Sequence, residues 1–158
     1  MSSSADKNFL DRAIQLACQS IDNNGGPFGA VIVRDNKIIG EGHNQVTLIN
    51  DPTAHAEIMA IRNACETIQN FDLSNCTIYS SCEPCPMCMS AIYWARINRV
   101  IYAASGEEAA SAGFDDTMIA HEICIPYDQR SISIECENSL KHERCFELWA
   151  QKTDKTEY

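Results

Sequence analysis

Positive charge is scarce in this chain of 158 residues, which carries 12 Lys and Arg against 22 Asp and Glu and has a net charge of −10. Proteins that bind nucleic acid neutralise phosphates with Lys and Arg, and the sequence holds no cluster of either. It also lacks an apolar run long enough to span a membrane, and residues 1–7 lack the basic start and apolar segment of a secretory signal. These absences favour a cytoplasmic protein that binds a small, uncharged molecule, and neither nucleic acid nor a membrane.

A paired set of cysteines is also missing, because the chain has nine of them and no export signal. We therefore expect reduced cysteines and no disulfide framework. Six of them are predicted to be small, mostly buried apolar residues: Cys18, Cys65, Cys76, Cys124, Cys136 and Cys145. The length of the chain fits a single domain, residues 1–158, with a substantial core.

Cysteine is instead concentrated in the segment Ser81–Cys88, of sequence SCEPCPMC. If a helix begins near Pro86, the i, i+3 spacing of Cys85 and Cys88 directs both sulfurs to the same side of its first turn. The start of a helix also favours an ionised thiol, which is the form that binds metal. We predict that His55 is the third ligand of a zinc ion. Two thiolates, one imidazole and an open fourth position are typical of a catalytic zinc.

Glu57 follows His55 by two residues, so its carboxylate can face the open position without binding the metal. Zinc lowers the pKa of water towards neutrality, and a carboxylate beside it can transfer the proton. The sequence therefore predicts one zinc ion per subunit, with Glu57 as the catalytic acid and base.

Two other metal sites fit part of the pattern. An iron–sulfur site would use Cys82, Cys85 and Cys88, which are spaced three residues apart, with a fourth thiolate from Cys76. A closed structural zinc would use Cys82 as its fourth ligand. The iron–sulfur alternative leaves the His-x-Glu pair unexplained, whereas a catalytic zinc accounts for both segments.

Hydrophobic periodicity and turn residues predict alternating helices and strands. Helices are predicted over residues 7–22, 56–68, 87–95, 107–111, 115–122 and 139–152, and strands over 29–33, 37–40, 77–79, 99–103 and 132–134. Residues 44–52 are predicted to form a loop. The strand, helix and strand over 77–103 have the spacing of a parallel crossover. Both ligand segments then start helices at the carboxyl edge of the sheet, where open α/β folds bind ligands.

These residues resemble the cytidine-deaminase-like superfamily, whose zinc-dependent nucleobase deaminases carry the signature H-x-E…P-C-x-x-C. Within it the chain is similar to the bacterial-type guanine deaminases. The narrower resemblance rests on Gly25–Ala30, Gly42–Asn44, Asn50–Glu57, Ser81–Cys88, Ala91–Arg96, Ala112–Asp116 and Tyr158. Residues 123–150 hold no matching motif. The resemblance implies a three-layer α/β/α fold with a central mixed sheet of about five strands flanked by helices.

Site residues beyond the metal ligands and Glu57 come from the resemblance alone. It implies that Phe28 stacks on a purine, that Asn44 hydrogen-bonds to it, and that Asp116 and Tyr158 face the amino group that leaves. Asp116 is thus also a catalytic candidate, and Ala56 and Trp94 are further substrate-binding candidates. Structural roles are the alternatives: core packing for Phe28, a turn for Asn44, a helix cap for Asp116 and a frayed tail for Tyr158.

The activity implied by the resemblance is hydrolysis of guanine to xanthine and ammonia. Alternatives are a guanosine deaminase, a tRNA adenosine deaminase, a cytidine deaminase and a zinc-binding module without catalysis. A cytidine deaminase would lack Ala112–Asp116, and the net charge of −10 opposes a tRNA substrate. The resemblance also implies a homodimer that exchanges the C-terminal segment, about residues 139–158, so that it closes the partner's active site.

Overall fold

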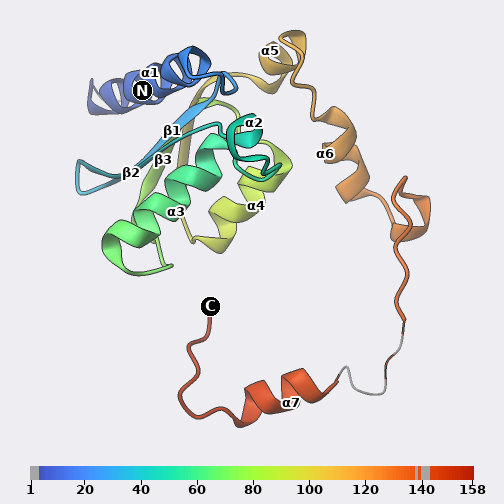
Figure 1. Cartoon of the computed structure of the whole chain (residues 1–158). Helices are drawn as coiled ribbons and strands as arrows, with labels where there is room; N and C mark the ends of the chain where they lie inside the picture. Colours follow the sequence, from blue (N-terminus) through green and yellow to red (C-terminus); the bar gives the residue numbers. More distant parts are fainter. Residues whose placement is uncertain (1–3, 138, 140–142) are drawn as a thin grey trace. The chain divides into compact units, whose positions relative to one another are not determined.

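The computed structural model describes residues 4–137, 139 and 143–158. It divides the chain into two compact units, Met1–His121 and Glu122–Tyr158. The first unit contains a four-stranded sheet in the order β2-β1-β3-β4 (Figure 1). Its strands are β1 Gly29–Arg34, β2 Lys37–His43, β3 Thr77–Cys82 and β4 Arg99–Ala104. Strand β1 is antiparallel to β2 and β3, whereas β3 and β4 are parallel, so the carboxyl ends of β2, β3 and β4 share one edge.

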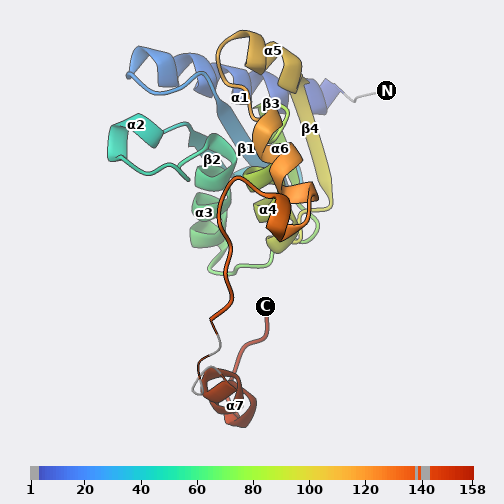
Figure 2. The ribbon, with the colours of Figure 1, turned by 90° about the vertical axis from the view of Figure 1, so that its right-hand side faces the viewer.

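Helices cover both faces of this sheet, as Figures 1 and 2 show. On one face α1, Ser4–Asp22, packs Leu16 against Val31 and Tyr79. On the other face α3, Ala56–Ile68, and α4, Pro86–Trp94, pack against residues of β1 and β3 such as Ile32 and Ile78. Residues 31 and 32 serve opposite faces because side chains alternate along a strand. The predicted three-layer α/β/α fold with a mixed sheet is confirmed.

Glycines of β2 bring α3 close to the sheet. A Cβ at Gly42 would lie 2.2 Å from the carbonyl oxygen of Ala56, and one at Gly40 would lie 2.5 Å from that of Ala60. Only a residue without a side chain allows the helix backbone to approach this closely. Gly42 therefore seats the first turn of α3, which follows His55, directly against the end of β2.

The prediction of about five strands is wrong, because the sheet has four. Residues 131–137 are described and form no strand. Ile132 and Ile134, which suggested a strand by their alternation, are 73% and 44% exposed. Alternation marks one apolar side of a segment, but a strand forms only where another strand supplies hydrogen-bond partners.

The other predicted elements are present with small shifts. Helices α5, Gly106–Ser111, and α6, Thr117–Cys124, match the predictions, and α2, Val46–Ile49, is a short helix inside the predicted loop 44–52. The second unit holds a 3-10 helix, Tyr127–Gln129, and α7, Glu143–Gln151. Most of the predicted start of that last helix, residues 140–142, lies outside the described residues. Among the helices that the structure describes, none is long and apolar enough to cross a membrane.

None of the nine cysteines forms a disulfide, but the predicted burial of six of them is mostly wrong. Cys76 is buried and Cys65 is half-buried. The other four are exposed: Cys18, Cys124, Cys136 and Cys145. Cys18 lies on the solvent side of α1, and the other three follow residue 121, where no described residue is buried.

Candidate active site

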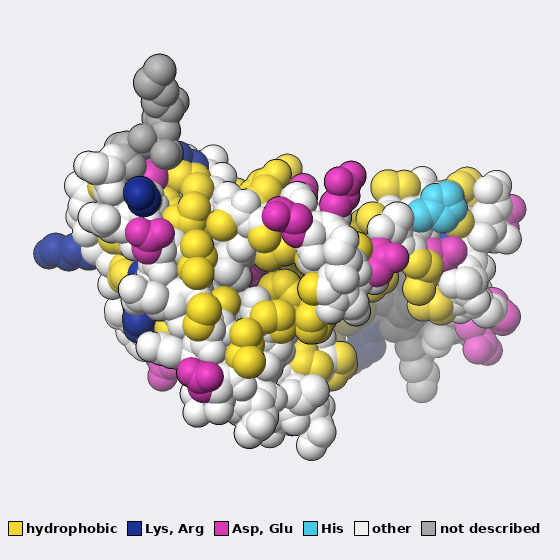
Figure 3. All heavy atoms as spheres, turned by 90° about the horizontal axis from the view of Figure 1, so that it is seen from above, with side chains coloured by type: hydrophobic (Ala, Val, Ile, Leu, Met, Phe, Trp, Pro, Cys, Tyr) yellow, Lys and Arg dark blue, Asp and Glu magenta, His cyan; other side chains and the backbone are white. Residues whose placement is uncertain are grey.

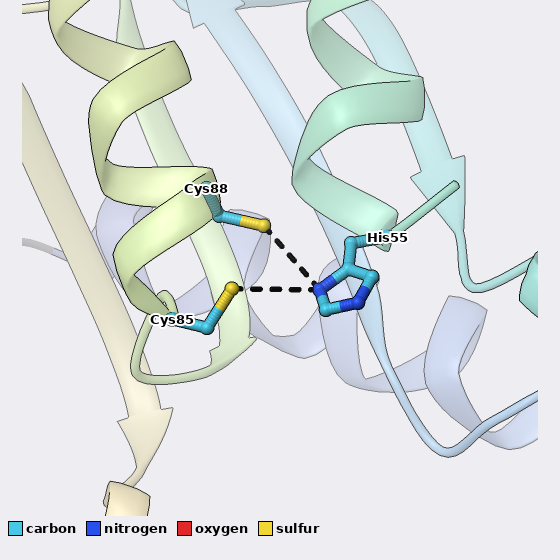
Figure 4. Close-up of side chains that lie close together, drawn as sticks. All are labelled: His55, Cys85 and Cys88. Atoms are coloured by element: carbon cyan, nitrogen blue, oxygen red, sulfur yellow. Dashed lines mark hydrogen bonds between the residues drawn. The ribbon is translucent and has the colours of Figure 1, made fainter. Parts of the chain in front are cut away.

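The three predicted metal ligands converge at the starts of two helices (Figure 4). His55 is the N-cap residue of α3, and Cys85 is the N-cap residue of α4, with Pro86 in its first turn. The Nδ1 atom of His55 lies 3.5 Å from the sulfur of Cys85 and 3.5 Å from that of Cys88. All three ligand atoms lie within 4.8 Å of one another. The predicted i, i+3 placement of the sulfurs therefore points both at one imidazole nitrogen.

This donor set fits zinc. Tetrahedral zinc, with bonds of about 2.3 Å to sulfur and about 2.0 Å to nitrogen, separates sulfur from nitrogen by about 3.5 Å. The observed 3.5 Å matches that separation. Neither Cys82 nor Cys76 belongs to this group among the residues described here, so the arrangement supports neither the closed zinc site nor the iron–sulfur site.

The pKa values of the Cys85 and Cys88 thiols also favour a bound cation at this site. A hydrogen bond from Cys88 and contact with His55 lower the pKa of Cys85 to about 4. The same bond to Cys85, together with burial, raises the pKa of Cys88. The protein alone thus carries one thiolate at this pair, and a second thiolate requires positive charge beside it. A bound divalent ion supplies that charge and releases the proton.

Glu57 lies beside the ligands in the first turn of α3 and is 6% exposed. Its Oε1 atom accepts a hydrogen bond of 3.1 Å from the hydroxyl of Ser80, and its Oε2 atom lies 3.4 Å from the Cys88 sulfur. Burial raises the pKa of the Glu57 carboxyl. A carboxyl whose pKa moves towards neutrality can both take up and release a proton, as a general acid and base requires.

A cavity of about 520 Å³ opens beside these residues. Its lining includes Phe28, Asn44, His55, Glu57, Cys85 and Asp116, which are all predicted site residues. Its volume lies within the range usual for small-molecule sites, about 300–1,000 Å³. The structure thus gathers three of the substrate-binding candidates and the catalytic candidates around one space.

Asn44 combines a turn with a place in the cavity wall. Its main-chain N–H donates to the carbonyl of Phe28 at 3.0 Å, and its side-chain oxygen accepts from the N–H of Val46 at 3.2 Å. Both the structural and the functional interpretation of this residue therefore have support, because the turn holds the amide at the cavity.

Sequence reasoning missed one aromatic residue of the cavity, Phe114. Its ring meets that of Phe28 edge to face, with centroids 4.9 Å apart. Phe114 belongs to the quoted Ala112–Asp116 segment, so a signal was present, but the segment does not indicate which of its residues turns inwards. Val46, Thr47 and Ile119 also line the cavity.

Three candidates do not line this cavity in the described part of the chain. Ala56 is fully buried in the core, and Trp94 is 68% exposed at the end of α4. Tyr158 belongs to the second unit, where it borders a groove on α7 with Phe146 and Trp149. Their roles in substrate binding stay predictions.

The fold and the site together define the class of protein to which the chain belongs. A His-Cys-Cys group and a buried glutamate at two helix starts, on one edge of a mixed sheet, are the spatial form of the hydrolytic deaminase signature. The chain belongs to the family of the cytidine and deoxycytidylate deaminase zinc-binding region, whose model matches residues 3–104.

Relatives narrow this class. Guanine deaminase of Bacillus subtilis is 50% identical over 153 residues, which cover 96% of this chain and 98% of the relative. The X-ray structure of a Bacillus subtilis guanine deaminase superposes with a TM-score of 0.93 at 50% identity, and covers 96% of this chain and 98% of that one. A tRNA-specific adenosine deaminase of Haemophilus influenzae is 41% identical over 124 residues, which cover 75% of this chain and 72% of the relative. The likeness to the guanine deaminase thus extends into residues 123–150, where the sequence offered no motif.

Proposed function

We propose that the protein catalyses the zinc-dependent hydrolysis of guanine to xanthine and ammonia. The observation that carries the chemistry is the convergence of His55, Cys85 and Cys88 beside the buried carboxyl of Glu57 at one cavity. Guanine as the substrate is supported by the likeness to the Bacillus subtilis enzyme over nearly the whole chain. A role in purine metabolism and a location in the cytoplasm belong to the same proposal.

His55, Cys85 and Cys88 hold one zinc ion in this proposal. When bound there, zinc supplies a Lewis acid that lowers the pKa of water. Glu57 accepts one proton of the water that attacks C2 of guanine and delivers it to the adjacent ring nitrogen. It then transfers the proton of the new C2 hydroxyl to the amino group, so that the C–N bond breaks, ammonia leaves and C2 becomes the carbonyl of xanthine. Burial of Glu57 supports this shuttle, because a raised pKa allows the carboxyl to exist in both protonation states during one turnover.

Phe28, Asn44 and Asp116 are assigned to substrate binding. The ring of Phe28 offers a flat surface for a purine, and the Asn44 amide supplies polar atoms for the edge of the base. Asp116 borders the same cavity as Glu57 and is assigned to the leaving amino group. The edge-to-face contact between Phe28 and Phe114 supports this arrangement by orienting the stacking ring.

A homodimer with exchanged C-terminal segments is also part of the proposal. No described residue of the second unit is buried, and α7 exposes Phe146 and Leu148 at 73% and 53%. A helix that exposes such side chains gains stability when a partner covers them. Tyr158 borders the α7 groove and Lys155 lies 5.9 Å from the centre of the Trp149 ring, so the tail lies against its own helix. An exchange of residues 139–158 would carry Tyr158 with that helix.

A tRNA substrate is the second candidate, because the Haemophilus influenzae relative acts on tRNA by its name. Charge opposes it. Acidic side chains are spread more widely than Lys and Arg over the face of the described residues in Figure 3, and the net charge is −10. Tight RNA binding relies on cationic contacts with phosphate.

The decisive measurement is ammonia release by zinc-loaded protein with guanine, guanosine, adenine, adenosine and cytidine in separate assays, with xanthine or xanthosine followed by ultraviolet absorbance. We expect strong turnover of guanine and none after zinc is removed. Faster turnover of guanosine would favour the nucleoside alternative. Bound zinc without ammonia release from any compound would favour a binding module and contradict the proposal.

A further inference from the structure

Buried polar side chains are few in the described residues and fall into a simple pattern. They are Asp6, Ser20, Asn44, Glu57 and Ser80. Asp6 bonds to the hydroxyl of Tyr79 and to the guanidinium of Arg99, which joins α1 to the sheet. The other four form two pairs, and each pair joins a serine to a residue of the cavity.

Ser80 supports the carboxyl of Glu57. It is 1% exposed, and its strand β3 has a paired neighbour on each side, β1 and β4. Its Oγ atom lies 3.1 Å from Oε1 of Glu57, while Oε2 faces the sulfur of Cys88. The carboxyl therefore has one oxygen directed at the metal group and the other held by the sheet, which fixes its rotation.

Ser20 supports the backbone of Asn44. It is 1% exposed near the end of α1, and its Oγ atom donates to the main-chain oxygen of Asn44 at 3.1 Å. Gly25 closes this corner, since a Cβ there would lie 2.4 Å from the Ser20 Oγ atom and 2.5 Å from the Asn44 oxygen. The hydroxyl thus connects α1 to the loop that presents Asn44 to the cavity.

We propose that Ser80 and Ser20 are positioning residues with separate tasks: Ser80 orients Glu57 for proton transfer, and Ser20 holds Asn44 for substrate binding. This inference rests on the proposed deamination of guanine and on the assigned roles of Glu57 and Asn44. A residue that acts only in the chemical step changes kcat, whereas one that acts in binding changes KM. The two serines should therefore have different kinetic signatures although the truncation is the same.

Ser80→Ala removes a hydrogen bond to a buried carboxyl. Hydrogen bonds to charged groups are strong enough that we expect kcat for guanine to fall about ten- to a hundredfold. KM and zinc content should stay within about twofold of wild type, because the variant leaves the Asn44 loop and the ligands in place. Ser80→Thr retains the hydroxyl and should recover most of kcat.

Ser20→Ala removes a neutral hydrogen bond to a main-chain oxygen. We expect KM for guanine to rise about two- to tenfold, while kcat stays within about twofold. Ser90→Ala is the matched control, because the exposed Ser90 hydroxyl bonds to the carbonyl of Pro86 within α4 and contacts neither Asn44 nor Glu57. Both kinetic constants should match wild type in that control.

The order of measurement separates the inference from the proposed function. If wild-type protein with bound zinc does not deaminate guanine, the proposed function fails before any variant is tested. If wild type is active but Ser80→Ala leaves kcat unchanged, or Ser20→Ala leaves KM unchanged, the positioning roles are wrong. Circular dichroism and zinc content are measured for each variant. Should an alanine variant fail to fold, the cysteine variant replaces it, because a thiol preserves the volume but donates weakly.

Discussion

The two sides of the cavity are built differently. The inner side includes Asn44, His55, Glu57 and Cys85, of which Asn44 and Glu57 are less than a tenth exposed. The outer wall consists of residues 106–119, whose cavity-lining side chains Phe114 and Ile119 are 46% and 48% exposed. Both belong to the first unit, so a single compact unit carries a closely packed side and an open side.

The inner side and the outer wall of the cavity also differ in how they are connected to the rest of the first unit. On the inner side, α3 is seated on the backbone of Gly42, and hydrogen bonds from Ser20 and Ser80 come from the core. The outer wall is joined to the rest by the bond of 3.0 Å from the N–H of Gly106 to the Glu83 carboxylate and by the contact of Phe114 with Phe28. Positions that need fixed geometry for proton transfer thus lie on the rigid side. Changes to Glu57 and the metal ligands should therefore abolish the chemical step, whereas loss of the Phe114 contact in the wall should weaken binding.

The largest effect is expected from loss of a ligand. Cys85→Ala leaves two protein ligands, which are too few for a stable zinc site. We expect zinc content measured by atomic absorption to fall from one ion per chain to near zero, and turnover to disappear. Cys18→Ala is the control, because this free thiol is exposed on α1. Full zinc content in Cys85→Ala would contradict the assignment of the metal ligands.

A nearly equal loss of activity, but with zinc retained, is expected for Glu57→Gln. The amide preserves the shape of the side chain but cannot accept and return a proton, so kcat should fall about a hundred- to ten-thousandfold. Glu66→Gln, on an exposed turn of the same helix, should leave kcat unchanged. If Glu57→Gln kept more than a few per cent of the turnover, another group would have to move the proton.

The sequence alone indicated the metal ligands and Glu57 because the signals of these residues are local. The spacing of Cys85 and Cys88 and the His-x-Glu pair each lie within one helical turn, so short-range geometry determines where they point. The hairpin at Asp35 and Asn36 is equally local, and both residues adopt the positive φ angles that such a turn requires. Hydrophobic periodicity then predicted the helices, whereas the three-layer arrangement was implied by the family resemblance.

Long-range contacts explain what the sequence could not provide. Phe28 and Phe114 meet across the cavity from segments 86 positions apart, and Ser20 and Asn44 meet between a helix and a loop. No periodicity encodes such pairs. The alternation at Ile132 and Ile134 indicated a segment with one apolar side, but a strand also needs a neighbour, which the alternation does not identify. Cysteine composition likewise did not indicate which thiols face solvent.

A smaller effect is expected in the outer wall, from Phe114→Ala. An edge-to-face aromatic pair contributes about 0.5–1.5 kcal/mol, so loss of the contact with Phe28 should raise KM for guanine about three- to tenfold. Zinc content and kcat should stay near wild type, because the Phe114 ring cannot form a hydrogen bond to Glu57 or bind the metal. Phe71→Ala is the matched control, because Phe71 is 40% exposed and contacts Arg96 away from the cavity. A large loss of kcat in Phe114→Ala would mean that the wall also sets the geometry of the chemical step, and the distinction between the two sides would fail.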